Sequence, residues 1–377
     1  MKHLLTGTLF LLFLCSDIKA NYNVLNFNSA DNLALNTPQY IAENMESLVA
    51  YGQANTQSEL EMTRFLFVWL AQNIHYDSSE LYAFKRTTSK QISDSVFHYR
   101  KGICRGYADL LTLLCQKAGI YARTVTGYAK SSGDKADSSD FHAWNAIKVA
   151  GQWHLFDVTW ASNYLERTGE VDSRFNQYFQ QNSENFTNRH FPFDPIWQLN
   201  NQIIPRYFFF NDTVTNWLAS DYFIDFNKIL EDESTMSPME QNLKSFERAV
   251  AFIPEEKRLH DVLNYYKSGK AHDLFEKANV LLDKFRNKSD AELRKWTPKD
   301  YKSMIADAQE AKGYFEKTMQ IYESMTYIAE NEDTESMKSN MVSIHKNKDL
   351  TDKLIDYLQN IVSDTKQLPI ARVNKRK

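Results

Sequence analysis

This sequence of 377 residues has few glycines, no long apolar run after its start and no excess of basic charge, and each of these features disfavours some classes of protein. Glycine occurs only 11 times, which favours a helix-rich structure. Beyond the first 20 residues no run of about 18 uninterrupted apolar residues occurs, so no stable membrane insertion is expected. An excess of basic charge is also missing: 44 basic and 48 acidic residues give a net charge of −4, which does not favour nucleic-acid binding. The 43% hydrophobic content predicts a globular chain with room for one or two domains.

Cysteine is rarer still, with 3 residues in the whole chain. Cys104 and Cys115 fall in one helical pattern, which separates them by about 16 Å at about 1.5 Å per residue. A disulfide needs Cα atoms within about 7 Å, so these two cysteines cannot pair. The sequence also lacks closely spaced ligand pairs such as C-x-x-C or H-x-x-x-H. We therefore expect no structural metal and no cofactor.

The first 20 residues have the pattern of a secretory signal peptide. Lys2 supplies a positive charge, Leu4 to Cys15 form a short apolar stretch, and Ala20 offers a cleavage site. A lipid anchor at Cys15 is less well supported, because Leu14 stands where a small residue is expected. The sequence therefore predicts export to the periplasm, the cell surface or the medium.

The patterns along the rest of the chain predict an α+β core followed by helices. A polar lead-in over 21–40 precedes the core elements, which we expect as two helices over 39–50 and 58–73, a strand over 121–129, and a hairpin over 141–160 that turns at Ala150-Gly151. Aromatic-rich loops and short strands should fill 165–235.

From residue 236 onward the pattern becomes almost continuously helical. We expect a core with its aromatic-rich extension over 21–235, a separate helical domain over 236–368, and a disordered basic tail over 369–377. The acidic, turn-prone stretch "EDESTMSP" at 231–238 is the predicted joint.

The stretch "KGICRGYADLLTLLCQKAGI" places a cysteine at the start of a helix. Apolar residues recur at helical spacing from Tyr107 onward, and Gly119 ends the pattern. Cys104 therefore lies at the helix N-terminus, where free N–H groups and the helix dipole favour a thiolate. Cys115 stands among leucines, and we expect it to pack in the core as a small hydrophobic residue.

The hairpin supplies the partners that a cysteine nucleophile needs. If both strands run their full length, His142 faces Thr159 and Trp144 faces Asp157, which puts His142 and Asp157 on one face along a diagonal. A carboxylate there can orient the imidazole, whose other nitrogen is left for Cys104. Alternatives are a chance pairing, with Asp157 bound to a surface cation, or a zinc ion held by the three residues. His154 falls on the opposite face, and no partner is evident for His98 or His190.

The segments "KGICRGYADLLTLLCQKAGI" and "HAWNAIKVAGQWHLFDVTW" resemble the transglutaminase-like superfamily, in the branch of bacterial and kyphoscoliosis-peptidase-like proteins. "RFLFVWLAQNIHYD" and "RHFPFDPIWQL" extend the resemblance over about residues 40–210. It implies a papain-like core in which a helix carrying the cysteine packs on an antiparallel sheet. It further implies Cys104 as nucleophile, His142 as base and Asp157 as the residue that orients the base.

These residues predict a thiol enzyme that cleaves or transfers peptide or protein amides through a thioester. The Cys104 N–H would be the first donor to the oxyanion, and Trp144 and Trp160 would form the walls of the substrate site. The alternative is a binding or scaffold protein without catalysis, in which the helical domain holds a protein partner.

Overall fold

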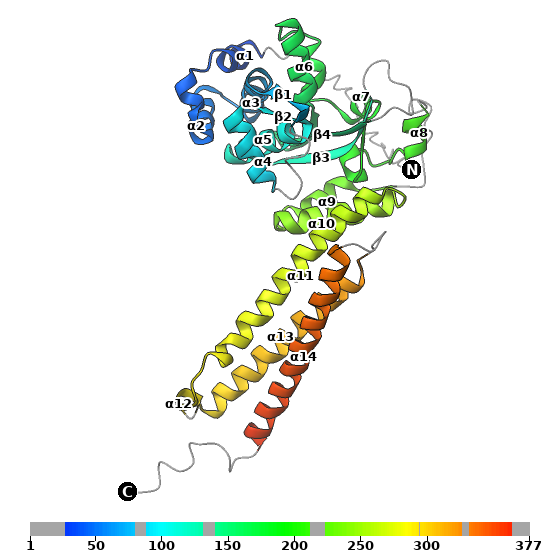
Figure 1. Cartoon of the computed structure of the whole chain (residues 1–377). Helices are drawn as coiled ribbons and strands as arrows, with labels where there is room; N and C mark the ends of the chain where they lie inside the picture. Colours follow the sequence, from blue (N-terminus) through cyan, green and yellow to red (C-terminus); the bar gives the residue numbers. More distant parts are fainter. Residues whose placement is uncertain are drawn as a thin grey trace, which may run out of the picture.

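The computed structural model describes residues 27–79, 88–130, 140–211, 223–293, 295–325 and 332–363. The predicted signal peptide and basic tail lie outside this part of the chain. Figure 1 shows a rounded α+β part, from which long helices project on one side. The prediction of an antiparallel-sheet core followed by helices is therefore confirmed.

The elements of the α+β part follow in a fixed order, with short helical turns labelled η. They are α1 (Asn28–Leu35), η1 (Gln39–Glu43), α2 (Met45–Asn55), α3 (Glu59–Asn73), β1 (His75–Tyr76), α4 (Ser89–Tyr99), β2 (Lys101–Gly102), α5 (Cys104–Lys117), β3 (Ala122–Ala129), β4 (Asp140–Val149), β5 (Gln152–Phe156), α6 (Val158–Thr168), η3 (Phe175–Tyr178), α7 (Ser183–Thr187), β6 (His190–Pro192), η4 (Pro195–Gln198), α8 (Arg206–Phe210) and α9 (Phe226–Glu233).

Four of these strands form an antiparallel sheet in the order β5-β4-β3-β6. The predicted hairpin is present, with Val149 opposite Gln152 on either side of the turn. The outer strand β6 comes from much later in the chain and pairs His190 with Ala129 of β3. This pairing brings an aromatic-rich segment to the edge of the sheet, one strand away from the start of β4.

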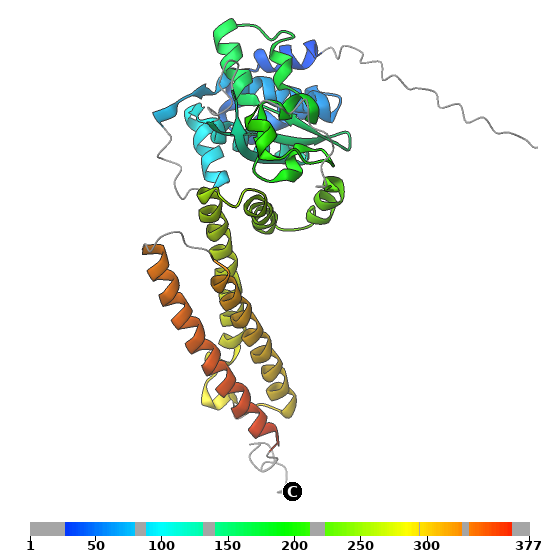
Figure 2. The ribbon, with the colours of Figure 1, turned by 90° about the vertical axis from the view of Figure 1, so that its right-hand side faces the viewer.

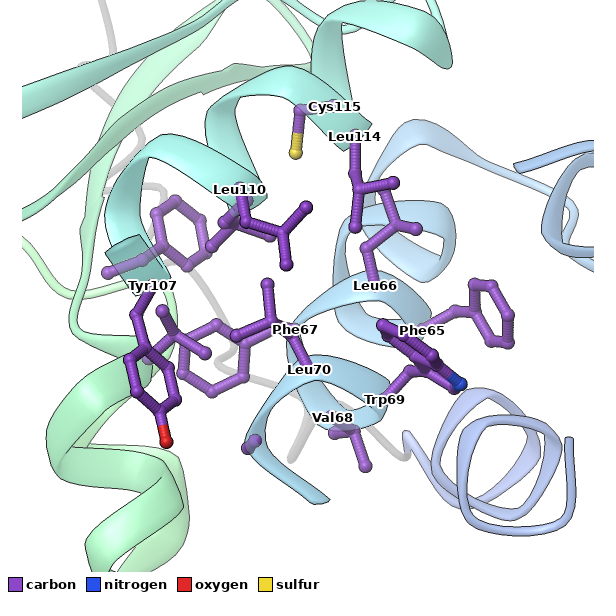
Figure 3. Close-up of a cluster of buried hydrophobic side chains, with 14 of the residues drawn as sticks. Phe65, Leu66, Phe67, Val68, Trp69, Leu70, Tyr107, Leu110, Leu114 and Cys115 are labelled. Atoms are coloured by element: carbon purple, nitrogen blue, oxygen red, sulfur yellow. The ribbon is translucent and has the colours of Figure 1, made fainter. Parts of the chain in front are cut away.

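The centre of the core is α3, whose residues from Met62 to Ala71 are all buried. A helix with apolar side chains on every side is expected to be surrounded by other elements. Figure 3 shows Phe67 and Leu70 of α3 near Leu110 of α5, with Cys115 beside Leu114. Cys115 is fully buried, and burial raises the pKa of its thiol. Its predicted packing role is confirmed.

Three local predictions are wrong. The expected helix over 39–50 is interrupted at Asn44, whose extended conformation separates η1 from α2. The polar lead-in over 21–40 contains the packed helix α1, because Asp31 supplies the carboxylate that the buried Arg64 of α3 needs, at 2.5 Å. The second hairpin strand does not reach residue 160. It ends at Phe156, and Asp157 caps the start of α6 instead.

The C-terminal region consists of helices: α10 (Pro238–Phe252), α11 (Lys257–Arg286), α12 (Asp290–Leu293), α13 (Pro298–Glu323) and α14 (Glu332–Ser363). Helix α10 and the start of α11 lie against the core, while the remainder of α11 projects away with α13 and α14 as a rod (Figures 1 and 2). Within the rod, α13 packs against both α11 and α14. Helix α10, which follows the joint predicted near residue 236, therefore lies against the core. The domain boundary at that joint stays a prediction.

None of the described helices combines the length and the apolar character that crossing a bilayer would require.

Candidate active site

Cys104 is the first residue of α5, as the sequence predicts. Ile103 precedes it in extended conformation, so the helix begins abruptly at the cysteine. Glycines allow this start: a Cβ on Gly106 would lie 2.7 Å from Val96 of α4, and one on Gly102 would lie 2.9 Å from it. The first N–H groups of α5 have no acceptor within the helix and favour negative charge beside them. Cys104 itself is partly exposed.

His142 of β4 connects Cys104 with Asp157. Its Nε2 lies 2.8 Å from Asp157 Oδ2, and its side chain is 8% exposed. The Cys104 side chain interacts with the same ring as a hydrogen-bond partner. Because Nε2 is engaged by the carboxylate, Nδ1 is the nitrogen that remains for the sulfur. The structure thus brings together the three residues that the sequence predicts.

Asp157 contacts His142 from the start of α6, and not from the second hairpin strand as predicted. As the N-cap of α6 it accepts a hydrogen bond on Oδ1 from the Trp160 N–H at 3.0 Å, which leaves Oδ2 for His142. The Asp157 side chain is completely buried. A capping carboxylate is fixed by the helix it starts, so Asp157 forms a rigid support for the imidazole.

His190 is the residue of this site that the sequence did not reveal. Its Nε2 lies 3.0 Å from the same Asp157 Oδ2, and the residue is 3% exposed. Its ring stacks on Phe186 with a centroid separation of 3.8 Å. The motif "RHFPFDPIWQL" marked the segment, but only the pairing of β6 with β3 shows that its histidine reaches Asp157.

The two histidines that contact Asp157 differ in protonation: His142 is charged and His190 is neutral. Burial opposes protonation of His142, but Asp157 and Cys104 outweigh it and raise the pKa of His142 to about 10. Burial lowers the pKa of His190 to about 4, and the charge on His142 acts in the same direction. Burial alone would raise the pKa of Asp157, yet His142 and His190 hold it well below its ordinary value. A charged His142, a neutral His190 and an ionised Asp157 therefore coexist near neutral pH.

The two tryptophans predicted as walls of the site differ in exposure. Trp160 is partly exposed and stacks on the His142 ring at 5.2 Å, which fits a wall that a substrate touches. Trp144 is 1% exposed, which does not fit contact with a substrate. Its ring lies 5.0 Å from that of His190, so it packs beneath the histidines as a floor.

Among the described residues, side chains with metal-ligating atoms gather at His142, Asp157 and His190, whose atoms lie within 4.8 Å of one another. This set differs from the zinc alternative considered from the sequence, which included Cys104. Two hydrogen bonds to one oxygen of Asp157 account for both short contacts. The geometry therefore gives no reason to place an ion between the histidines, and the expectation of no metal stays a prediction.

Comparison with known proteins agrees with this geometry. Residues 46–158 match the transglutaminase-like superfamily. The chain is 31% identical over 182 residues to kyphoscoliosis peptidase of Homo sapiens and 32% identical over 170 residues to that of Mus musculus, covering 46% and 42% of this chain. A LIM and transglutaminase domain protein of Caenorhabditis elegans, ltd-1, is 24% identical over 197 residues, which cover 46% of this chain and 26% of that protein.

The matches span only 27% and 25% of the two kyphoscoliosis peptidases, about a quarter of their length. A crystal structure from Cytophaga hutchinsonii named "Putative Cysteine Protease" shares 25% identity, covering 36% of this chain and 44% of that chain. Its TM-score of 0.25 is too low to show a shared fold. The family match includes Cys104, His142 and Asp157 and stops before His190. Over residues 46–158, the core of this chain is thus similar to the transglutaminase-like superfamily.

Proposed function

We propose that this protein is a thiol enzyme of the transglutaminase-like type that acts on amide bonds of peptides or proteins. The observation that carries the proposal is the position of His142, which interacts with Cys104 on one side and with the buried Asp157 on the other. A nucleophile, a base and a group that orients the base are the minimum set for covalent acyl transfer by a thiol.

In the first step the Cys104 thiolate attacks the carbonyl carbon of the amide, and the C=O π electrons move to oxygen. The Cys104 N–H at the start of α5 is the first candidate to donate to this oxyanion. The intermediate then expels the amine, which takes its proton from the charged His142, and a thioester on Cys104 remains. Asp157 stabilises the imidazolium before this transfer and holds the ring in the required tautomer afterwards.

In the second step a nucleophile attacks the thioester while the now neutral His142 accepts its proton. The tetrahedral intermediate then expels the Cys104 thiolate, which restores the free enzyme. Water as the nucleophile gives hydrolysis, whereas an amine gives a new amide bond. The names of the human and mouse relatives favour peptide hydrolysis and a protein substrate. The apolar stretch near the N-terminus further supports the proposal that the enzyme acts outside the cytoplasm.

Alkylation of Cys104 at about pH 6 tests the proposal. An ordinary thiol with a pKa near 8.5 is almost fully protonated there and reacts slowly with iodoacetamide. We expect Cys104 to react at least about 10-fold faster than a free thiol, because His142 beside it can accept the thiol proton. Cys104→Ser should abolish both labelling and turnover, and Cys115→Ser should change neither. A Cys104 that labels no faster than free cysteine would overturn the enzyme proposal.

The alternative of a non-catalytic scaffold has one observation in its favour. Val342, Leu350 and Tyr357 recur along α14 at spacings that keep them on one side of the helix, and each is exposed. The rod therefore offers an apolar strip to a protein partner. Normal thiol reactivity of Cys104, together with partner binding by the rod, would favour this second function.

A further inference from the structure

A cavity of about 460 Å³ lies between the core and the helices that follow it. One wall is a face of α5 that runs from Arg105 to Gln116 together with β3, and the opposite wall belongs to α10 and the start of α11. The lining includes Arg105, which directly follows Cys104 and interacts with it electrostatically. The cavity thus reaches the start of α5 beside Cys104, and its volume is that of a small-ligand pocket.

Positive charge dominates the lining. Lys90, Arg105, Arg123 and Arg258 face the cavity together with only two carboxylates, Asp109 and Asp194. Asp109 already accepts hydrogen bonds from Arg105 at 2.6 Å and from Thr124 at 2.8 Å. Asp194 is 4% exposed and accepts hydrogen bonds from Arg248, which also pairs with Glu233 behind the wall. Both lining carboxylates therefore have cationic partners of their own.

Arg123 of β3 differs from Arg105 and Arg248 because its hydrogen-bond acceptors are neutral amides. Its guanidinium donates to the side-chain oxygens of Gln241 and Asn242, the second at 3.0 Å. Burial lowers the pKa of Arg123, and the charges of Glu233 and Asp194 act on it only through space. A half-buried guanidinium bound by amides gains from a carboxylate that enters the cavity, because charge-assisted bidentate pairs are among the strongest hydrogen bonds.

Arg258 lies toward the other end of β3 from Arg123, where Phe141 pairs with Tyr128. The Arg258 guanidinium, exposed at the start of α11, lies 4.0 Å from the centroid of the Phe141 ring. Phe141 packs in turn against Phe193 at 5.4 Å. Phe246 of α10 lines the same space. The cavity therefore presents cations and aromatic surface together.

We propose that this cavity binds a peptide segment that carries an acidic side chain next to an aromatic or aliphatic one, and that it thereby selects substrates for Cys104. Arg123 receives the carboxylate, and Phe246, one helical turn from Asn242, receives the apolar neighbour. Helix α10 and the start of α11 are in this view part of the substrate site. The assignment of the ligand as substrate rests on the proposed function, whereas the binding of an acidic peptide does not.

Calorimetric titration of the full chain carrying Cys104→Ala tests the proposal with two matched probes, the acetylated amides of Ala-Phe-Glu-Ala and Ala-Phe-Gln-Ala. We expect the Glu peptide to bind at least about 10-fold more tightly, because charge-assisted hydrogen bonds are stronger than neutral ones. Adding Arg123→Gln, or Asn242→Asp, which gives Arg123 a carboxylate of its own, should bring both peptides to equal affinity. Arg286→Gln, at the far end of α11, is the matched control and should preserve the preference.

Equal binding of the two peptides, or a preference that survives both cavity variants, would overturn the proposal. Binding of inorganic phosphate without discrimination between the peptides would also overturn it, since it would reveal a general anion site. Asn242→Asp keeps Arg123 and a hydrogen-bond acceptor for it, so this variant should fold even if Arg123→Gln lowers the melting temperature. Because the assay does not need the thiol, selective binding with an unreactive Cys104 would refute the enzyme proposal and leave the cavity assignment standing.

Discussion

The α+β core and the helical rod place their charges in opposite ways. In the core, Asp157, Arg64 and Asp109 are 0%, 0% and 3% exposed, and each takes part in a hydrogen-bonded network. In the rod, the pairs that join the helices lie at the surface. Lys312 and Asp352, which link α13 to α14, have side chains 37% and 35% exposed.

This difference predicts where substitutions have large effects. A buried charge that loses its partner keeps its full desolvation cost, about 3–5 kcal/mol, whereas an exposed pair contributes about 0–1 kcal/mol. Buried networks also fix geometry, which a catalytic site requires. The core is therefore the part in which single changes should alter chemistry, and the rod the part in which they should be tolerated.

Asp157→Asn should give the largest effect. The amide removes the charge that holds His142 protonated and favours the wrong imidazole tautomer, so turnover should fall by about 10³-fold or more while the fold persists. The rate of Cys104 alkylation at about pH 6 reports the loss of thiol reactivity that accompanies the lower turnover. A circular dichroism spectrum shows whether the fold persists. Asp352→Asn in the rod is the control, with no expected change. Near-normal turnover in folded Asp157→Asn would make this carboxylate merely structural.

His190→Gln should give a smaller effect with a distinct pH signature. The glutamine can still donate to Asp157, so we expect a loss of turnover of about 10-fold. Because the pKa of His190 is about 4 in the fold against 6.5 for the free side chain, the unfolded chain binds an extra proton between these values. Stability of the wild type should therefore fall as the pH decreases from about 6.5 to about 4.

Urea denaturation across this range should show a weaker pH dependence for His190→Gln than for the wild type. His98→Gln serves as the control, since His98 is exposed and should leave the profile unchanged. Parallel pH profiles for wild type and His190→Gln would contradict the neutral state assigned to His190.

The sequence predicted features that depend on local pattern. The start of α5 at Cys104 follows from helical periodicity, and the strand over 122–129 follows from its alternating β-formers. The partnership of His142 and Asp157 was predicted from a hairpin extended too far. Val158, Thr159 and Trp160 have the composition of a strand, but Asp157 caps a helix there. Capping by a short polar side chain outweighed β propensity at this position.

Features that depend on distant segments could not be predicted. His190 reaches Asp157 only because the three-residue strand β6 pairs with β3, and so short a strand leaves no periodic signal. Asp31 and Arg64 are likewise joined over 33 positions. The acid-selective cavity requires α10 and α11 to lie over α5, which no local pattern indicates. Such contacts arise from tertiary packing, which local patterns in a single sequence do not indicate.

A third prediction compares one buried ion pair with one exposed pair. Arg248 of α10 donates to Asp194 at 2.8 Å and also pairs with Glu233, and Asp194 is 4% exposed. Arg248→Met should leave both carboxylates without a cation and lower the free energy of unfolding by about 3 kcal/mol. Lys312→Met in the rod should lower it by less than about 1 kcal/mol. Chemical denaturation measures both, and equal losses would remove the distinction between the two regions.

The smallest effect should come from deleting the rod altogether. The apolar cluster on the core includes Ile253 and Leu259, whereas the rod cluster begins at Ala271. Lys270 still pairs with Glu240 of α10 at 2.7 Å. A chain that ends after residue 270 therefore keeps the core contacts of α10 and α11, and its Cys104 alkylation rate should stay within about twofold of the wild type.

A chain that ends after residue 233, at the joint predicted from the sequence, should behave differently. It loses Arg248 and exposes Phe191 and Phe209, which pack against α10 and α11 in the same apolar cluster. With about 3 kcal/mol lost, its melting temperature should lie about 6–12 °C below that of the longer chain. Calorimetry on the two chains decides where the core ends. Equal melting temperatures and equal Cys104 reactivity would place the boundary near residue 236, and α10 would then belong with the rod.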